Sequence, residues 1–131
     1  MNSRLTNLAF LIWLIAVFIL SVYPDNEVLA EGPLSFDTHG YFQHVIAYAA
    51  GMGIGYYSTI FDRRWKIGMV VLLWGIGLEA AQYWLPYRSF NVFDMLANVC
   101  GVLLGLLGAA ILNKNISRAA RPQPKTNHQE L

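Results

Sequence analysis

The sequence predicts an all-α protein, a four-helix transmembrane bundle with both termini on the cytoplasmic side. Of its 131 residues, 56% are hydrophobic and only 13% are charged, whereas charged residues make up about 25% of an average soluble domain. The chain contains four apolar segments, each close to the roughly 20 residues that a helix needs to cross a bilayer. Its basic residues lie almost entirely on one side of these segments, as expected for a membrane protein.

The first apolar segment covers about residues 5–22, and its run LAFLIWLIAVFIL contains no polar residue. This run is longer than the apolar core of a usual signal peptide, so we expect a retained helix rather than a cleaved leader. The other segments cover about 41–61, 67–85 and 92–112. Helices of a soluble bundle would each carry a polar face, which the run IGMVVLLWGIGL lacks. We therefore predict one transmembrane domain over residues 1–112.

Charged residues predict the orientation of this domain. Arg4 precedes the first segment, and Arg88 is the one basic residue in the first and third loops. The remaining basic residues lie between the second and third segments or follow the fourth: Arg63, Arg64, Lys66, Lys114, Arg118, Arg121 and Lys125. Because basic residues concentrate on the cytoplasmic side, we predict that both termini are cytoplasmic. The polar segment 113–131 is expected to be a disordered basic tail.

Three of the four segments each carry a pair of polar residues spaced three or four apart: His44 with Tyr48, Glu79 with Gln82, and Asp94 with Asn98. Residues at this spacing share one face of a helix, and the predicted topology places all three pairs in the outer half of the membrane. Ionisable residues inside a membrane usually face the bundle interior or a wet cavity and pair with one another. The sequence therefore predicts one polar pocket that opens to the outer surface.

Small residues also repeat at a spacing of four. Gly101 and Gly105 belong to such a stripe on the fourth segment, and Gly51 and Gly55 to one on the second. Stripes of this kind let membrane helices approach closely. They predict tight packing around the polar pocket but no chemistry.

Glu79, His44 and Asp94 are the candidate catalytic residues. A carboxyl group in a desolvated site could serve as a general acid or base, and a histidine could transfer protons. Each also has a structural interpretation. Glu79 could pair with Arg88 or accept a hydrogen bond from His44, and Asp94 with Asn91 resembles a helix capping box.

Four further side chains are candidate ligand-binding residues: Arg88, Gln82, Asn98 and Tyr48. A guanidinium group such as that of Arg88 can hold a phosphate or carboxylate through two hydrogen bonds. Structural interpretations again remain open, because Asn98 could hydrogen-bond across helices and Tyr48 could simply pack in the core.

Several kinds of site are not expected. We predict no metal site and no cofactor, because His39 and His44 are five residues apart, whereas ligand pairs on one helix favour a spacing of four. Cys100 is the one cysteine, which excludes an internal disulfide and a cysteine-based zinc site. The net charge of +1 gives no sign of a nucleic-acid partner.

Four motifs carry a resemblance to a known family: SVYP (Ser21–Pro24), HVIAY (His44–Tyr48), EAAQ (Glu79–Gln82) and YRSFNVFDMLANVCGVLLG (Tyr87–Gly105). Together they resemble the VanZ-like family of bacterial membrane proteins over about residues 1–112. That family usually has Asp-Lys just ahead of the histidine, where this chain has Gly40 and Tyr41. No role that needs the Asp-Lys pair is therefore carried over.

The resemblance implies a four-helix protein of the bacterial cytoplasmic (inner) membrane, in a family named after a member linked to teicoplanin resistance. It implies no particular reaction, and whether the protein is an enzyme stays open. We expect the pocket to bind or process a cell-envelope molecule, with a membrane lipid or a cell-wall precursor headgroup as partner. The alternative is a structural or accessory subunit, with a membrane-protein partner, whose polar cluster only locks the helices. A proton or ion pathway ranks last, because the inner halves of the segments are apolar.

Overall fold

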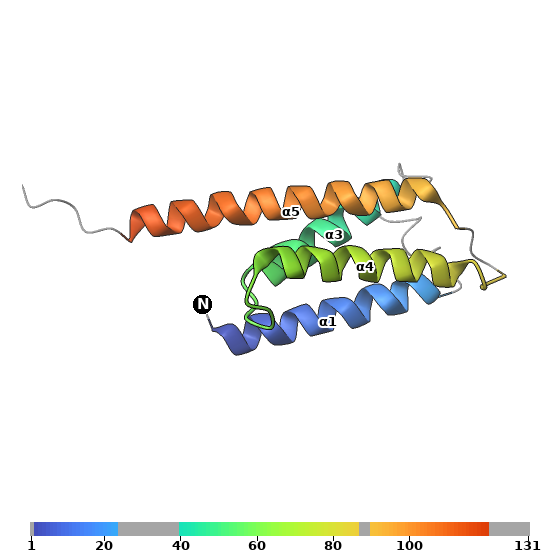
Figure 1. Cartoon of the computed structure of the whole chain (residues 1–131), viewed down its shortest axis with the longest axis horizontal. Helices are drawn as coiled ribbons and strands as arrows, with labels where there is room; N and C mark the ends of the chain where they lie inside the picture. The colour runs from blue at the N-terminus through green and yellow to red at the C-terminus, as the bar shows by residue number, and fades with distance from the viewer. Residues whose placement is uncertain (1, 24–39, 87–89, 121–131) are drawn as a thin grey trace, which may run out of the picture.

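The computed structural model describes residues 2–23, 40–86 and 90–120, and these residues form four helices and no strand. The helices are α1 (Ser3–Val22), α3 (Tyr41–Tyr56), α4 (Arg64–Gln82) and α5 (Val92–Ala119). They lie side by side as a bundle, with α1 and α5 on opposite sides and α3 and α4 between them (Figure 1). The prediction of an all-α fold is therefore confirmed.

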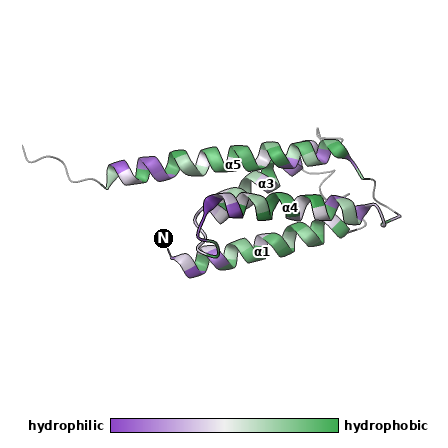
Figure 2. Cartoon of the chain, viewed as in Figure 1, coloured by the Kyte–Doolittle hydropathy of each residue, from purple (hydrophilic) through white to green (hydrophobic). Residues whose placement is uncertain are grey.

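Apolar residues make up most of the four helices (Figure 2). Among the described residues, α1 and α5 are the two helices that are long and apolar enough to cross a membrane. Helix α3 has 16 residues, which is slightly below the range of about 17–25 for a span. Helix α4 has 19 residues, but Arg64, Lys66 and Glu79 reduce its mean hydropathy. Four complete spans therefore remain a prediction.

Helix α4 begins and ends earlier than the predicted 67–85. Pro86 explains its end, because a proline ring would clash with the carbonyl of Gln82 in a continued helix and disfavours a helical backbone at Leu85. The Leu85 N–H instead donates to the Gln82 carbonyl oxygen, three residues back, at 2.9 Å. At the other end, the Lys66 ammonium donates to the Asp62 carboxylate at 2.6 Å. This hydrogen bond lowers the pKa of the exposed Asp62 carboxyl below its ordinary value.

Helix α3 ends at Tyr56, five residues before the predicted end at 61. Asn7 of α1 hydrogen-bonds the residues that directly follow α3. Its Oδ1 accepts hydrogen bonds from Ser58 Oγ at 2.9 Å and from Thr59 N at 2.8 Å. These bonds satisfy polar groups after the helix end and attach the α3–α4 turn to α1.

Helix α5 continues to Ala119, seven residues past the predicted end at 112. The first part of the predicted disordered tail is therefore helical. Polarity alone does not end a helix, because each added residue gains a backbone hydrogen bond at little cost once the helix exists. This polar end projects beyond the other helices (Figures 1 and 2). The rest of the predicted tail, 121–131, lies outside the described residues.

The most extensive helix contact joins α3 and α5. A Cβ atom at Gly101 would lie 2.5 Å from the Val45 carbonyl oxygen, and one at Gly105 would lie 3.0 Å from Ala49 Cα and collide with the Ala49 carbonyl oxygen. The predicted close approach at these two glycines is confirmed. It brings the backbones of α3 and α5 into direct contact.

Replacing Gly105 by alanine will lower stability. The added methyl group meets backbone atoms of Ala49, so the helices must separate, at a cost of about 1–3 kcal/mol. Gly108→Ala is the matched control on the same helix, because nothing lies within 4 Å of its Cβ position. Its helix propensity improves by about 1 kcal/mol, so its stability will be unchanged or higher. Thermal unfolding in detergent measures both, and equal melting temperatures would contradict the packing argument.

Asn7→Ala will also destabilise the bundle. The substitution leaves the Ser58 hydroxyl, which is 1% exposed, without the acceptor that it has in the structure. Loss of the acceptor of a buried donor costs about 1–3 kcal/mol. Asn115→Ala, on the exposed end of α5, serves as the control and will leave the melting temperature unchanged. A loss of stability of the same size in both variants would assign no special role to Asn7.

Candidate functional site

Polar side chains of α3, α4 and α5 meet at the end of the bundle opposite the N-terminus. His44 lies in the first turn of α3, Glu79 in the last turn of α4, and Asp94 in the first turn of α5. Because successive helices run in opposite directions, these three turns lie together (Figure 1). The structure thus brings together all three candidate catalytic residues.

His44 is the centre of this group. Its Nδ1 lies 2.8 Å from Asn98 Oδ1 and 4.0 Å from Glu79 Oε1, and its Nε2 lies 3.9 Å from Asp94 Oδ2. We call these four residues the His44 cluster. Each of α3, α4 and α5 contributes to it, so the cluster exists only in the folded bundle.

Most of the cluster is buried, and the imidazole is its most exposed part. Glu79 is 2% exposed and Asn98 is 3% exposed, whereas the His44 side chain is 27% exposed. A ligand from outside the bundle would therefore meet the imidazole before it meets Glu79 or Asn98.

The hydrogen bond to Asn98 determines the role of each imidazole nitrogen. The Asn98 carbonyl oxygen only accepts hydrogen bonds, so in the neutral ring Nδ1 carries the proton and donates it to Asn98. Nε2 then keeps its lone pair and faces Asp94. Within the described part of the chain, the Asn98 Nδ2 donor is buried and has no hydrogen-bond partner.

Asn91 positions the third member, Asp94. As the N-cap of α5, Asn91 accepts a hydrogen bond from Phe93 N at 3.0 Å. Its Nδ2 also donates to Asp94 Oδ1 at 3.3 Å. Asp94 thus contacts the helix cap through Oδ1 and faces His44 through Oδ2.

Tyr48 lies directly behind the imidazole. It is 3% exposed, and its ring stacks on that of His44, with centroids 6.4 Å apart and an interplanar angle of 9°. It also makes an edge-to-face contact with Trp13. Tyr48 is thus a wall between the cluster and the apolar core.

Gln82 lies apart from the His44 cluster contacts described above. Its Nε2 donates to the Ser21 hydroxyl at 2.8 Å and to the Ser21 carbonyl oxygen at 3.2 Å, which joins the end of α4 to the end of α1. The sequence analysis assigned no role to Ser21, although this residue is the first of the SVYP motif. The remaining candidate, Arg88, lies outside the described residues.

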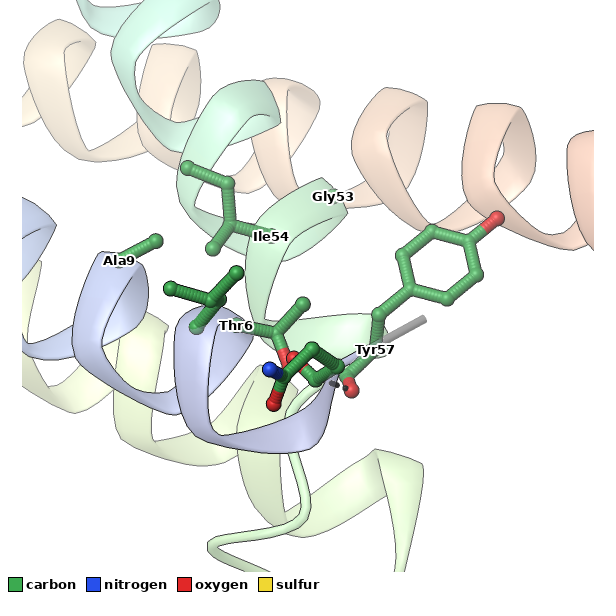
Figure 3. Close-up of a pocket in the computed structure, with 7 residues that line it drawn as sticks. Thr6, Ala9, Gly53, Ile54 and Tyr57 are labelled. Atoms are coloured by element: carbon green, nitrogen blue, oxygen red, sulfur yellow. Dashed lines mark hydrogen bonds between the residues drawn. The ribbon is translucent and has the colours of Figure 1, made fainter.

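A groove of about 420 Å³ lies between α1 and α3 (Figure 3). It is near the start of α1 and the end of α3, away from the His44 cluster. Thr6, Ala9, Gly53, Ile54 and Tyr57 are among the residues that line it. The Thr6 hydroxyl donates to the Tyr57 carbonyl oxygen at 3.2 Å. With no carboxylate or imidazole in its lining, this groove offers no acid–base or metal-binding group.

The His44 cluster offers a nitrogen lone pair, two carboxyl groups and a buried amide donor. These groups could transfer a proton, bind a cation, or hydrogen-bond a polar headgroup. Among the described residues, no serine or cysteine contacts His44 in the manner of an activated nucleophile. The geometry favours acid–base or binding chemistry over covalent catalysis.

Comparison with known proteins identifies a family for this chain. The VanZ/LLP1 family model covers residues 8–113, a range that contains the whole His44 cluster. No curated protein and no solved structure matches the chain. Together with the two long apolar helices, the match supports a VanZ-like membrane protein. The resemblance seen in the sequence motifs is confirmed, and the chain belongs to the VanZ/LLP1 family.

Proposed function

We propose that this protein binds, or binds and processes, the polar headgroup of a cell-envelope amphiphile at the outer face of the bacterial cytoplasmic membrane. The His44 cluster is the binding site, and all four helices cross the membrane with both termini in the cytoplasm. Lipid-linked wall precursors, phospholipids and lipoglycopeptides such as teicoplanin share the required chemistry, a polar head on an apolar chain.

The observation that carries this proposal is the convergence of three polar side chains, those of Glu79, Asp94 and Asn98, on the imidazole of His44. Burying an ionisable side chain among apolar helices costs free energy unless the group is paired or hydrogen-bonded. A side-chain hydrogen bond between membrane helices returns only about 0.6 kcal/mol on average. The stabilisation from helix locking is therefore small compared with the cost of burying two carboxyl groups. This comparison favours a site in which the carboxyl groups bind a ligand or transfer protons.

The position of the cluster supports access from the membrane surface. Described basic residues lie at the other end of the bundle, at the start of α1, in the α3–α4 turn and at the end of α5: Arg4, Arg63, Arg64, Lys66, Lys114 and Arg118. If that end is cytoplasmic, the partly exposed His44 faces the outer leaflet. An amphiphile could then keep its chain in lipid while its headgroup reaches the cluster.

A structural role is the second candidate, and the His44–Asn98 hydrogen bond favours it. That bond joins α3 to α5 at 2.8 Å, which a purely helix-locking cluster would also require. Under this alternative the protein is an accessory membrane subunit, and substitutions in the cluster change its stability without any ligand being involved.

Native mass spectrometry of the protein in mild detergent tests the proposal. We expect a lipid or wall precursor to copurify with the wild type and to be lost, or at least tenfold depleted, in Glu79→Gln. This variant keeps the size of the buried side chain but removes its ability to ionise. Arg88→Ala tests in the same way whether the unassigned arginine of the third loop contributes to binding.

Asp62→Asn is the matched control, because it removes an exposed carboxylate at the opposite end of the bundle and will retain the copurifying molecule. Thermal unfolding of each variant separates the two candidate functions. No bound species in the wild type, together with a lower melting temperature for Glu79→Gln, would replace the binding site by the structural role.

Cysteine labelling tests the orientation. Cys100 is first replaced by alanine, and single cysteines are then introduced by Trp84→Cys and Asp62→Cys, at exposed positions on opposite ends of the bundle. A membrane-impermeant thiol reagent added to spheroplasts will modify position 84 and leave position 62 unmodified until the cells are lysed. The reverse pattern would place the His44 cluster at the cytoplasmic face.

A further inference from the structure

We infer that the His44 cluster is a binding site for one divalent first-row metal ion, with His44, Glu79 and Asp94 as its protein ligands. One candidate ligand atom from each of these residues lies within 4.8 Å of the other two. From the sequence alone we expected no metal site, because we looked for ligand pairs on one helix, whereas these three ligands lie on three separate helices. This inference stands independently of the headgroup proposed above.

The imidazole of His44 is held in a tautomer that suits metal binding. Histidines that bind a metal almost always donate a hydrogen bond from their other ring nitrogen to a carbonyl, carboxylate or water, which fixes the tautomer. His44 meets this condition, because Nδ1 lies 2.8 Å from Asn98 Oδ1. Its Nε2 is therefore available as a metal ligand and faces the Asp94 carboxylate.

The separation of the His44 and Asp94 ligand atoms is close to that in a metal site. Nitrogen and oxygen ligands lie about 2.0–2.2 Å from Zn²⁺, so two of them in a tetrahedral site are roughly 3.4 Å apart. The 3.9 Å between His44 Nε2 and Asp94 Oδ2 exceeds this separation by about 0.5 Å. A small rotation of either side chain brings both atoms into one coordination shell.

Asn98 provides a buried hydrogen-bond donor beside the three candidate ligands. Its side-chain Nδ2 is buried, in a residue that is 3% exposed, and it lacks a hydrogen-bond partner in the described ranges. It belongs to the same amide whose oxygen binds His44, so it lies within the cluster. An amide donor cannot bind a cation, but it can bind an oxygen ligand on that cation, such as a water molecule or a phosphate oxygen. Such a ligand would complete the shell that three protein residues leave open.

The donor set selects the metal. Imidazole suits Zn²⁺ and other late transition ions, whereas carboxylates suit Mn²⁺ and harder ions. One imidazole and two carboxylates form a mixed set that accepts Zn²⁺ and Mn²⁺ and discriminates against soft ions such as Cu⁺. Because imidazole is a weaker ligand for Mg²⁺ and Ca²⁺, these ions will bind less tightly than Zn²⁺.

Isothermal titration of the chelator-treated, detergent-solubilised protein with Zn²⁺ or Mn²⁺ alone tests the inference, and elemental analysis after gel filtration gives the stoichiometry. We expect one ion per wild-type chain. His44→Gln and Asp94→Asn will each weaken binding at least 100-fold, and Asn98→Ala will weaken it by about 10–100-fold, as expected for loss of a residue that orients a ligand. Asp62→Asn, which changes an exposed acid far from the cluster, will bind as the wild type does.

A visible absorption spectrum of the wild type loaded with Co²⁺ gives a second readout that does not depend on the stability of any variant. A wild-type protein that binds neither ion would overturn the inference. Equal affinity in the wild type and in a folded His44→Gln variant would also overturn it, because the ion would then be bound elsewhere. Neither result affects the copurification experiment, so failure of the metal site and failure of the headgroup site are distinguishable.

Discussion

The close approach of α3 and α5 is the constraint on which the rest of the structure depends. Gly101 and Gly105 permit it, because a Cβ atom at either position would run into the backbone of α3. One turn from Gly101, the same contact places Asn98 within 2.8 Å of His44. A bundle with more widely separated helices would leave both polar side chains buried without each other, which is costly where water is excluded.

From this contact the remaining groups of the site are held in place by separate anchors. Asn91 contacts one oxygen of Asp94, Tyr48 stacks behind the imidazole, and Gln82 joins α4 to Ser21 of α1. None of these anchors uses His44 Nε2, the nitrogen that faces Asp94. The supporting contacts thus orient the cluster while leaving its reactive atom accessible, which is the arrangement that preorganised sites require.

Local patterns in the sequence predicted the parts of this structure that depend on local physics. Spacings of three and four placed His44, Glu79 and Asp94 on faces that meet, and the glycine stripe identified the contact between α3 and α5. Tertiary contacts decided what these patterns could not. Gln82 has the same spacing from Glu79 that a shared pocket requires, yet it hydrogen-bonds Ser21. The helix ends differed as well, because Asn7 and Pro86 act on α3 and α4 in ways that hydropathy does not register.

The structural role and the ligand-binding role of the cluster involve different nitrogen atoms of the His44 imidazole. Locking α3 to α5 requires only Nδ1 and the Asn98 oxygen, and an amide or hydroxyl in place of the imidazole could provide the same bond. That bond does not involve Nε2, which lies 3.9 Å from Asp94 Oδ2, the distance of an ion pair when the imidazole is protonated. Nor does it explain a buried amide donor on Asn98 with no partner among the described residues. Both features are accounted for by a ligand between the imidazole and the carboxylates, and this asymmetry is the strongest reason to treat the His44 cluster as a site.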